Sequence, residues 1–396
     1  MFIFILKSDA HRNLPDVDRR QLEMCIRDSR EAAEPDRNHK EVKSNEDFPF
    51  ITDILSQPEG VRNAVKGYDP EALNALTRRF QAGEFDRIIL TGMGSSFFAA
   101  YAAWVRLAQA GLPAIWVDAS ELNSYAAAMI NSRTILWMIS NSGKIIEMTR
   151  LLNRRAELGS PFILANTNYP ESPLGLAADL IVPIHTGNDI TLATRSYLGT
   201  LAVTQLMTYN LAGKPVDAAL DDLRYTADGL EAYLADLEGH IQELDHLLGD
   251  VRKLAILGRG ASYATALEGA LCFMEGPKLY VQGLSTGQFW HGAVEMASPE
   301  FTILAMEGEE QTSKEDEFLA AKAAGLGVKV YWFANDRSAS LPTVVLPKNR
   351  GIGRTLVEIV PIQLISINVG KQTGFRPGDF IHLTHTVNTK VEEFPG

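Results

Sequence analysis

Apolar and polar positions along the chain predict short buried strands that alternate with helices. The first series of predicted strands covers residues 87–90, 114–117, 134–139, 162–165 and 180–183. A second series covers residues 253–257, 301–306, 328–333 and 343–347. Two short amphipathic helices are expected within residues 51–81, ahead of the first strand. Strands that alternate with helices predict parallel sheets covered by helices on both faces.

Two glycine-rich turns occupy equivalent places in the two series and predict an internal duplication at domain scale. They are Gly92-Met-Gly-Ser-Ser after the first strand and Gly258-Arg-Gly-Ala-Ser after the strand at 253–257. The predicted divisions are an extension outside the fold at 1–47, a first domain at 48–216, a helical linker at 217–250, a second domain at 251–370 and a tail at 371–396. Residues 8–47 are dominated by charge with little periodicity, which is typical of disorder.

Composition narrows the classes of function. A chain of 396 residues that is 46% hydrophobic can bury two α/β cores. A net charge of −12 argues against nucleic acid or an anionic membrane surface as a partner, because both require clustered Lys and Arg. We expect no membrane-spanning segment. With only two cysteines, neither a disulfide framework nor a Cys-rich metal site is expected, and a cytoplasmic location fits best.

Small polar residues follow several predicted strands, where an open parallel sheet binds its ligands. The candidates for a phosphate site are Ser95, Ser96, Ser140, Asn141, Ser142, Gly143 and Lys144, and the candidates for further substrate contacts are Gly94, Thr194 and Glu268. A helix is expected directly after Gly143, so that free amides and hydroxyls would hold a phosphate without a metal. The alternative is that these residues only cap helices. The turns match neither a Walker loop nor a dinucleotide fingerprint, so no cofactor is expected.

The second half supplies candidate acid–base groups. Glu268 and Glu275 lie seven positions apart on one predicted helix, and therefore on roughly one face. Most of their neighbours are apolar, so each carboxylate is either paired structurally or functional. His291 follows shortly afterwards, and a lone histidine beside aromatic residues is most often structural. The pair Glu275 and His291 together could move a proton between sugar carbons and assist ring opening.

These residues resemble the isomerase half of glucosamine-6-phosphate synthase and its relatives, which are built from two sugar isomerase (SIS) domains. The resemblance covers about residues 48–392 and rests mainly on the run from Gly258 to Gly292. It implies two tandem SIS domains, each a parallel-sheet αβα sandwich of flavodoxin-like type, with a C-terminal tail over the active site. It implies that Glu275 is the catalytic glutamate, that His291 opens the ring, and that Ser140-Asn-Ser-Gly143 is the phosphate loop.

Three positions depart from the pattern of the family. Ile145 stands where the phosphate loop usually ends in Ser or Thr, and Cys272 replaces a lysine of the catalytic helix. The near-terminal lysine that engages the sugar carbonyl has His385 as its best match here, ahead of His382 and Lys390. If no lysine reaches the site, an imidazole must activate the carbonyl instead.

The resemblance implies a phosphorylated amino sugar or ketose-amine as substrate. With about 47 residues ahead of the first predicted domain, a glutamine-hydrolysing activity is not expected. We therefore expect a deaminase or deglycase with aldose–ketose isomerase chemistry, without metal or cofactor. A homodimer with a shared active site is implied as well. The alternatives are a simple ketose–aldose phosphate isomerase and a non-catalytic phosphosugar sensor.

Overall fold

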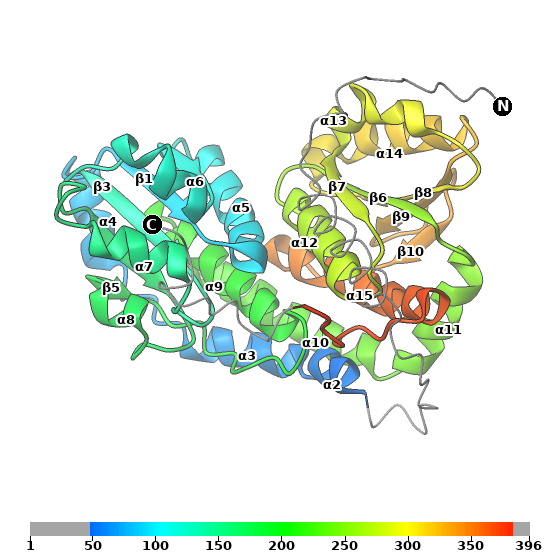
Figure 1. The fold of residues 1–396 in the computed structure, drawn as a ribbon, viewed down its shortest axis with the longest axis horizontal. Helices are drawn as coiled ribbons and strands as arrows, with labels where there is room; N and C mark the ends of the chain where they lie inside the picture. Colours follow the sequence, from blue (N-terminus) through cyan, green and yellow to red (C-terminus); the bar gives the residue numbers. More distant parts are fainter. Residues whose placement is uncertain (1–47, 383–396) are drawn as a thin grey trace, which may run out of the picture. The chain divides into compact units, whose positions relative to one another are not determined.

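The computed structural model of the chain describes residues 48–382, which hold two parallel sheets of five strands each (Figure 1). The first sheet contains β1 (Arg87–Thr91), β2 (Ala114–Trp116), β3 (Thr134–Ile139), β4 (Phe162–Asn166) and β5 (Leu180–Ile181). The second contains β6 (Lys253–Gly258), β7 (Val281–Ser285), β8 (Phe301–Met306), β9 (Lys329–Ala334) and β10 (Thr343–Val345). The predicted fold of two α/β domains is confirmed.

Both sheets have the same strand order. It is β2-β1-β3-β4-β5 in the first sheet and β7-β6-β8-β9-β10, read from the other edge, in the second. This is the flavodoxin-like order, in which the chain reverses direction across the sheet between the first and third strands. Each sheet therefore has one switch point, between β1 and β3 or between β6 and β8, where a crevice can open.

Helices cover the faces of the sheets. Those of the first half are α2 (Pro49–Leu55), α3 (Gln57–Gly67), α4 (Asn74–Gln81), α5 (Gly94–Gln109), α6 (Ala119–Ser124), η3 (Ala127–Met129), α7 (Ile146–Asn153), α8 (Pro173–Ala177) and α9 (Arg195–Leu211). Later in the chain come α10 (Asp217–Leu234), α11 (Leu237–Leu248), α12 (Ser262–Glu275), α13 (Thr286–Trp290), η4 (Ala293–Met296), α14 (Glu310–Ala324), η5 (Gly351–Gly353) and α15 (Arg354–Thr373).

Three details differ from the prediction. Within the described residues ahead of β1, three helices are present rather than two. Strand β7 was missed, because Val-Gln-Gly-Leu-Ser has neither the alternation nor the apolar run that marks a strand. Helix α7 begins at Ile146 rather than directly after Gly143. Gly143 has a φ of +63°, and Ile145 is extended, so two residues separate the serine loop from the helix.

The central strands are buried on both faces, as a sheet between two helical layers requires. Ile88 and Leu90 of β1 belong to the largest core cluster, whereas Ile89 between them belongs to a separate cluster on the other face. The largest cluster also includes Leu107 of α5 and Phe273 of α12, and these two helices pack against each other. The α5–α12 contact therefore joins the first half of the chain to the second.

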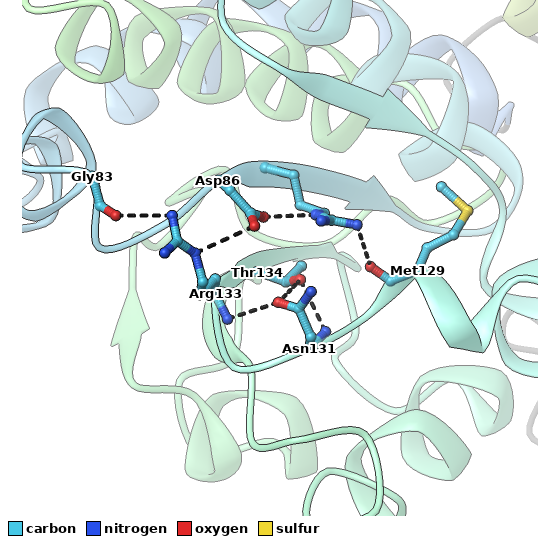
Figure 2. Close-up of polar contacts among 7 residues, drawn as sticks. Gly83, Asp86, Met129, Asn131, Arg133 and Thr134 are labelled. Carbon is cyan, nitrogen blue, oxygen red and sulfur yellow. Dashed lines mark hydrogen bonds and ion pairs between the residues drawn. The ribbon is translucent and has the colours of Figure 1, made fainter.

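The amino end of the first sheet is tied together by polar contacts (Figure 2). Arg133 lies just before β3, and its guanidinium contacts Asp86 at 3.3 Å and donates to Gly83 O at 3.1 Å. Arg87 pairs with the same aspartate at 2.7 Å and donates to Met129 O at 3.2 Å. These partners occupy the end of the sheet opposite to the switch-point crevice and have a structural role.

Within residues 48–382, one helical segment, Gly351–Thr373, is long and apolar enough to span a membrane by length and composition, whereas no such segment was predicted from the sequence. Within the folded unit, 94% of its apolar window is buried. A buried segment of this kind is what the core helix of a water-soluble domain shows. It is therefore weak evidence for a membrane span.

Glu358 is buried in α15 and gives a prediction for stability against pH. Ser262 Oγ and Thr265 Oγ1 donate to its two oxygens at 2.7 and 3.0 Å, yet burial raises the pKa of Glu358 from 4.5 to about 7. A carboxyl whose pKa is raised on folding destabilises the fold as pH rises from the unfolded pKa through the folded one. We expect Glu358→Gln to match wild type near pH 4.5 and to gain stability between pH 5 and 8, by on the order of 3 kcal/mol. Urea unfolding at several pH values measures this, and a gain that does not grow with pH would contradict it.

Candidate functional site

A cavity of about 530 Å³ opens at the switch point of the first sheet. It lies past the carboxyl ends of β1 and β3, which pair in parallel from Arg87–Thr134 to Thr91–Met138. Its walls are Met93, Gly94, Ser95, Ser96, Ser140, Asn141, Ser142, Ile145, Tyr169, Asn188, Asp189, Thr191, Ala193, Ser196, Tyr197 and Thr200. Six predicted substrate-site residues, five of them assigned to the phosphate, are thus brought together from the two turns after β1 and β3.

The turn after β1 presents the amino end of α5 to the cavity. Gly92 allows this tight turn, because a Cβ there would lie 3.0 Å from Ile139 O and from Phe97 N. The first bond of the helix runs from Phe97 N to Met93 O at 3.4 Å. The N–H groups of Gly94, Ser95 and Ser96 precede that bond, so they carry the positive end of a 16-residue helix. These free amides belong to α5, and the amino end of α7 also lies at the site, because its N-cap residue Ile145 lines the cavity.

The turn after β3 is held by a hydrogen bond within the turn and by close packing against Ser172. Ser140 is buried, and its Oγ accepts from Gly143 N at 3.0 Å. Gly143 fits against Ser172, where a Cβ would lie 2.0 Å from the hydroxyl oxygen. Ser142 Oγ accepts from Lys144 N at 3.3 Å, which leaves its O–H free to donate into the cavity.

Two predicted phosphate-site residues do not line the cavity. Gly143 is buried beneath the loop. Lys144 is exposed, and its ammonium lies 6.0 Å from the ring of Tyr169, which does line the cavity. Thr194 is also buried outside the lining, and its hydroxyl donates to Asp189 at 2.8 Å.

Glu268 reaches the site from the second half of the chain. Its side chain is 3% exposed, and Ser95 Oγ donates to its Oε1 at 3.0 Å. The other oxygen is buried without a hydrogen-bond partner among the described residues. Burial raises the pKa of Glu268 well above 4.5, and the neighbouring Glu275 raises it further. Glu268 stands behind Ser95 and is poised to be protonated, rather than lining the cavity as a direct contact.

Glu275 is the last residue of α12 and is partly exposed. Burial raises its pKa, while the nearby Lys278 ammonium acts in the opposite direction. Lys278 donates to the carbonyl oxygens of Glu275 and of Asp379, the latter at 2.8 Å. A carboxyl with a raised pKa at the end of a helix is suited to act as a general acid or base. Burial also raises the pKa of the neighbouring Cys272 to about 12, which argues against a reactive thiol.

The remaining predicted groups lie elsewhere. His291 is exposed just after α13 and is not among the residues that line the cavity. His382 is exposed at the end of the described chain. His385 and Lys390 lie outside the described residues.

Several groups in the loop between β5 and α9, and in the first turn of α9, were not predicted from the sequence. Asp189 lines the cavity and accepts hydrogen bonds from Thr194 and Ser196. Tyr197 lines it as well, and its buried hydroxyl has no hydrogen-bond partner within residues 48–382. The signal was an aspartate five to seven residues ahead of two hydroxyl residues at a helix start, a pattern that usually indicates capping alone.

A second cavity, of about 780 Å³, lies at the corresponding switch point of the other sheet. It is lined in part by Ala261, Gly308, Glu309, Arg106 and Arg354. Both of its arginines are already paired: Arg106 contacts Glu309 at 2.9 Å, and Arg354 contacts Glu307 at 2.6 Å. Within residues 48–382, no group of His, Cys, Asp or Glu is placed to hold a metal ion. The serine-lined cavity is therefore the better candidate site.

Comparisons with known proteins agree with this architecture. The glutamine–fructose-6-phosphate aminotransferase (isomerizing) of Pyrococcus horikoshii is 26% identical over 336 residues, which are 83% of this chain and 55% of that protein. Its counterpart from Methanothermobacter thermautotrophicus is 27% identical over 343 residues, 85% of this chain and 56% of that protein. The chain thus spans about half the length of these curated relatives.

Solved structures share the fold at lower identity. The C-terminal domain of glucosamine-fructose-6-phosphate aminotransferase from Francisella tularensis has a TM-score of 0.72 at 18% identity, covering 87% of this chain and 100% of that one. Tagatose-6-phosphate ketose/aldose isomerase from Escherichia coli has a TM-score of 0.70 at 20% sequence identity, and the match covers 88% of this chain and 100% of that one. Glucosamine-6-phosphate deaminase from Thermotoga maritima has a TM-score of 0.68 at 16% sequence identity, and the match covers 86% of this chain and 99% of that one.

The family described as SIS domain matches residues 84–211 and 247–367, which contain the two sheets. The protein therefore belongs to the SIS domain family, and it is homologous to the isomerase half of glutamine–fructose-6-phosphate aminotransferase.

Proposed function

We propose that the protein is a phosphosugar enzyme of the aldose–ketose isomerase type that removes nitrogen from an amino-sugar phosphate or a fructosamine phosphate. The observation that carries this proposal is the serine-lined cavity at the β1/β3 switch point, with a carboxylate-bearing helix of the second half packed behind it. Hydroxyls and helix amides suit a phosphate, and carboxyls with raised pKa suit proton transfer.

In the proposed mechanism, the phosphate binds to the two turns and His291 assists opening of the sugar ring. Glu275 then moves a proton between C1 and C2, which converts the amine-bearing carbon into an imine. Water adds to the imine carbon, and nitrogen leaves as ammonia or as an amine. Each step conserves atoms and electrons, and water is the only co-reactant.

We infer a homodimer with a shared active site. His291 is exposed and does not line the cavity of its own chain. An exposed histidine can serve the cavity of a second copy, which reconciles its predicted role with its position. A cytoplasmic location is proposed from the two cysteines, of which Cys272 is buried and unpaired.

An activity screen tests the proposal. The protein is incubated with glucosamine-6-phosphate, with fructosamine-6-phosphates and with tagatose-6-phosphate, and release of ammonia, amine or aldose is followed. Isomerisation of tagatose-6-phosphate without nitrogen release would favour the simple ketose–aldose isomerase, a candidate supported by the fold of the Escherichia coli structure. Tight binding of a phosphosugar without any turnover would favour a sensor.

Ser142 tests the phosphate loop. Its free O–H would bind the phosphate in the ground state and in the transition state alike, so Ser142→Ala should raise KM and leave kcat nearly unchanged. Loss of a hydrogen bond to a charged group predicts a rise of about 10- to 100-fold. Steady-state kinetics measures the change, and unphosphorylated glucosamine serves as the control ligand. Equal affinity for the phosphorylated and unphosphorylated sugars in wild type would rule out a phosphate site here.

A further inference from the structure

The lining of the serine-lined cavity carries negative charge but no positive charge. Its lining residues include one carboxylate, Asp189, and no lysine, arginine or histidine. A phosphate monoester carries between one and two negative charges at neutral pH. Amides and hydroxyls of the two turns can hold that phosphate, but the carboxylate beyond them repels any ligand that is only anionic.

The carboxylate of Asp189 is held in place on several sides. Thr194 Oγ1 donates to it at 2.8 Å, Ser196 N donates at 3.3 Å, and the Ser196 hydroxyl donates as well. The next residues of its loop are fixed by buried Asp53, which accepts from Thr191 N and Oγ1 at 2.7 Å. A carboxylate offers about four acceptor sites. Three are used, so a further acceptor site remains on a rigid group in the cavity wall.

The surroundings leave this charge without compensation by a cation in the cavity wall. Burial raises the pKa of Asp189, and the negative charge of Asp53 raises it further. Asp189 in turn contributes to the raised pKa of Glu268. Arg195 starts α9 nearby, but its guanidinium donates to the backbone oxygen of Asn188. A cationic ligand group beside Asp189 would relieve the mutual repulsion of these carboxylates.

We propose that Asp189 binds the protonated nitrogen of the substrate and thereby selects amine-bearing phosphosugars over neutral ones. The inference rests on the proposed function, because it assigns the other end of the same ligand. The phosphate lies against the serine turns, and the ammonium group lies against Asp189 and its loop. A zwitterionic ligand matches a cavity whose lining combines hydrogen-bond donors with one carboxylate.

Two open-chain analogues that cannot isomerise test this assignment. They are 2-amino-2-deoxyglucitol-6-phosphate and glucitol-6-phosphate, and binding to the full-length protein is measured by calorimetry. Wild type should bind the amine about 10- to 100-fold more tightly, the range expected for a hydrogen bond to a charged group. Asp189→Asn should bring this ratio close to one, while the affinity for inorganic phosphate and for glucitol-6-phosphate falls less than about 3-fold.

Two further variants distinguish a loss of the amine contact from a structural effect of the substitution. Thr194→Val removes one donor to the carboxylate but keeps its charge, and should keep the preference for the amine. Asp189→Glu keeps the negative charge and should retain part of the preference for the amine. An unchanged ratio in Asp189→Asn, or no preference in wild type, overturns the inference while leaving phosphate binding intact. Failure of the protein to bind either analogue or inorganic phosphate would overturn this inference and the proposed function together.

Discussion

Glu275→Gln should lower kcat by roughly 10²- to 10⁴-fold, the usual loss when a general base is removed. Glutamine keeps the size and the hydrogen-bonding shape of the side chain but cannot accept the proton. Because burial disfavours the charged form of Glu275, the neutral variant should not melt at a lower temperature than wild type. The direct measurement is exchange of the substrate C2 proton with deuterated solvent, followed by NMR.

Controls separate this effect from general damage. Glu300 is an exposed glutamate that pairs with Lys253 and does not line the cavity, so Glu300→Gln should exchange at the wild-type rate. His291→Asn should be milder than Glu275→Gln on a substrate supplied in its open form, because ring opening is then complete. Exchange at the wild-type rate in Glu275→Gln would remove this residue from the mechanism.

Deletion from Gly378 onward should abolish turnover while the protein stays folded and keeps its oligomeric state. The described start of this segment already runs toward the site. Pro377 lies against Gly276 at the end of α12, and Lys278 contacts Asp379 O. A Cβ on Gly378 would lie 2.7 Å from Thr191, a residue of the cavity wall. The described start of the tail therefore leads toward the cavity wall, and a role of the tail over the active site stays a prediction.

Activity, thermal melting and light scattering of the truncated protein test this expectation together. Point variants at His382, His385 and Lys390 then locate the contribution along the tail. A loss confined to His385→Ala would fit an imidazole that activates the carbonyl. Full activity of the truncated protein would make all three side chains bystanders.

The periodicity of the sequence determined most of the fold. Nine strands were predicted within one or two residues of their bounds, because each is a dense apolar run next to a glycine or a turn. Strand β7 was missed because Gln282 and Gly283 break its apolar run. Gly283 is required there by packing, since a Cβ would lie 2.3 Å from Ala266 O, and no local pattern announces such a contact.

The sequence by itself also determined which strand ends carry hydroxyls, and so indicated six of the residues that line the cavity. Only the tertiary structure decided how those residues are used. It showed that α5 supplies the free amides, that Ser95 donates to Glu268 across the α5–α12 contact, and that Asp189 faces the same space. The physical reason is that periodicity records which side chains are buried, whereas hydrogen bonds and charge interactions depend on distances between residues far apart in sequence. Ser95 and Glu268 are 173 positions apart, and only packing of the two halves brings them within 3.0 Å.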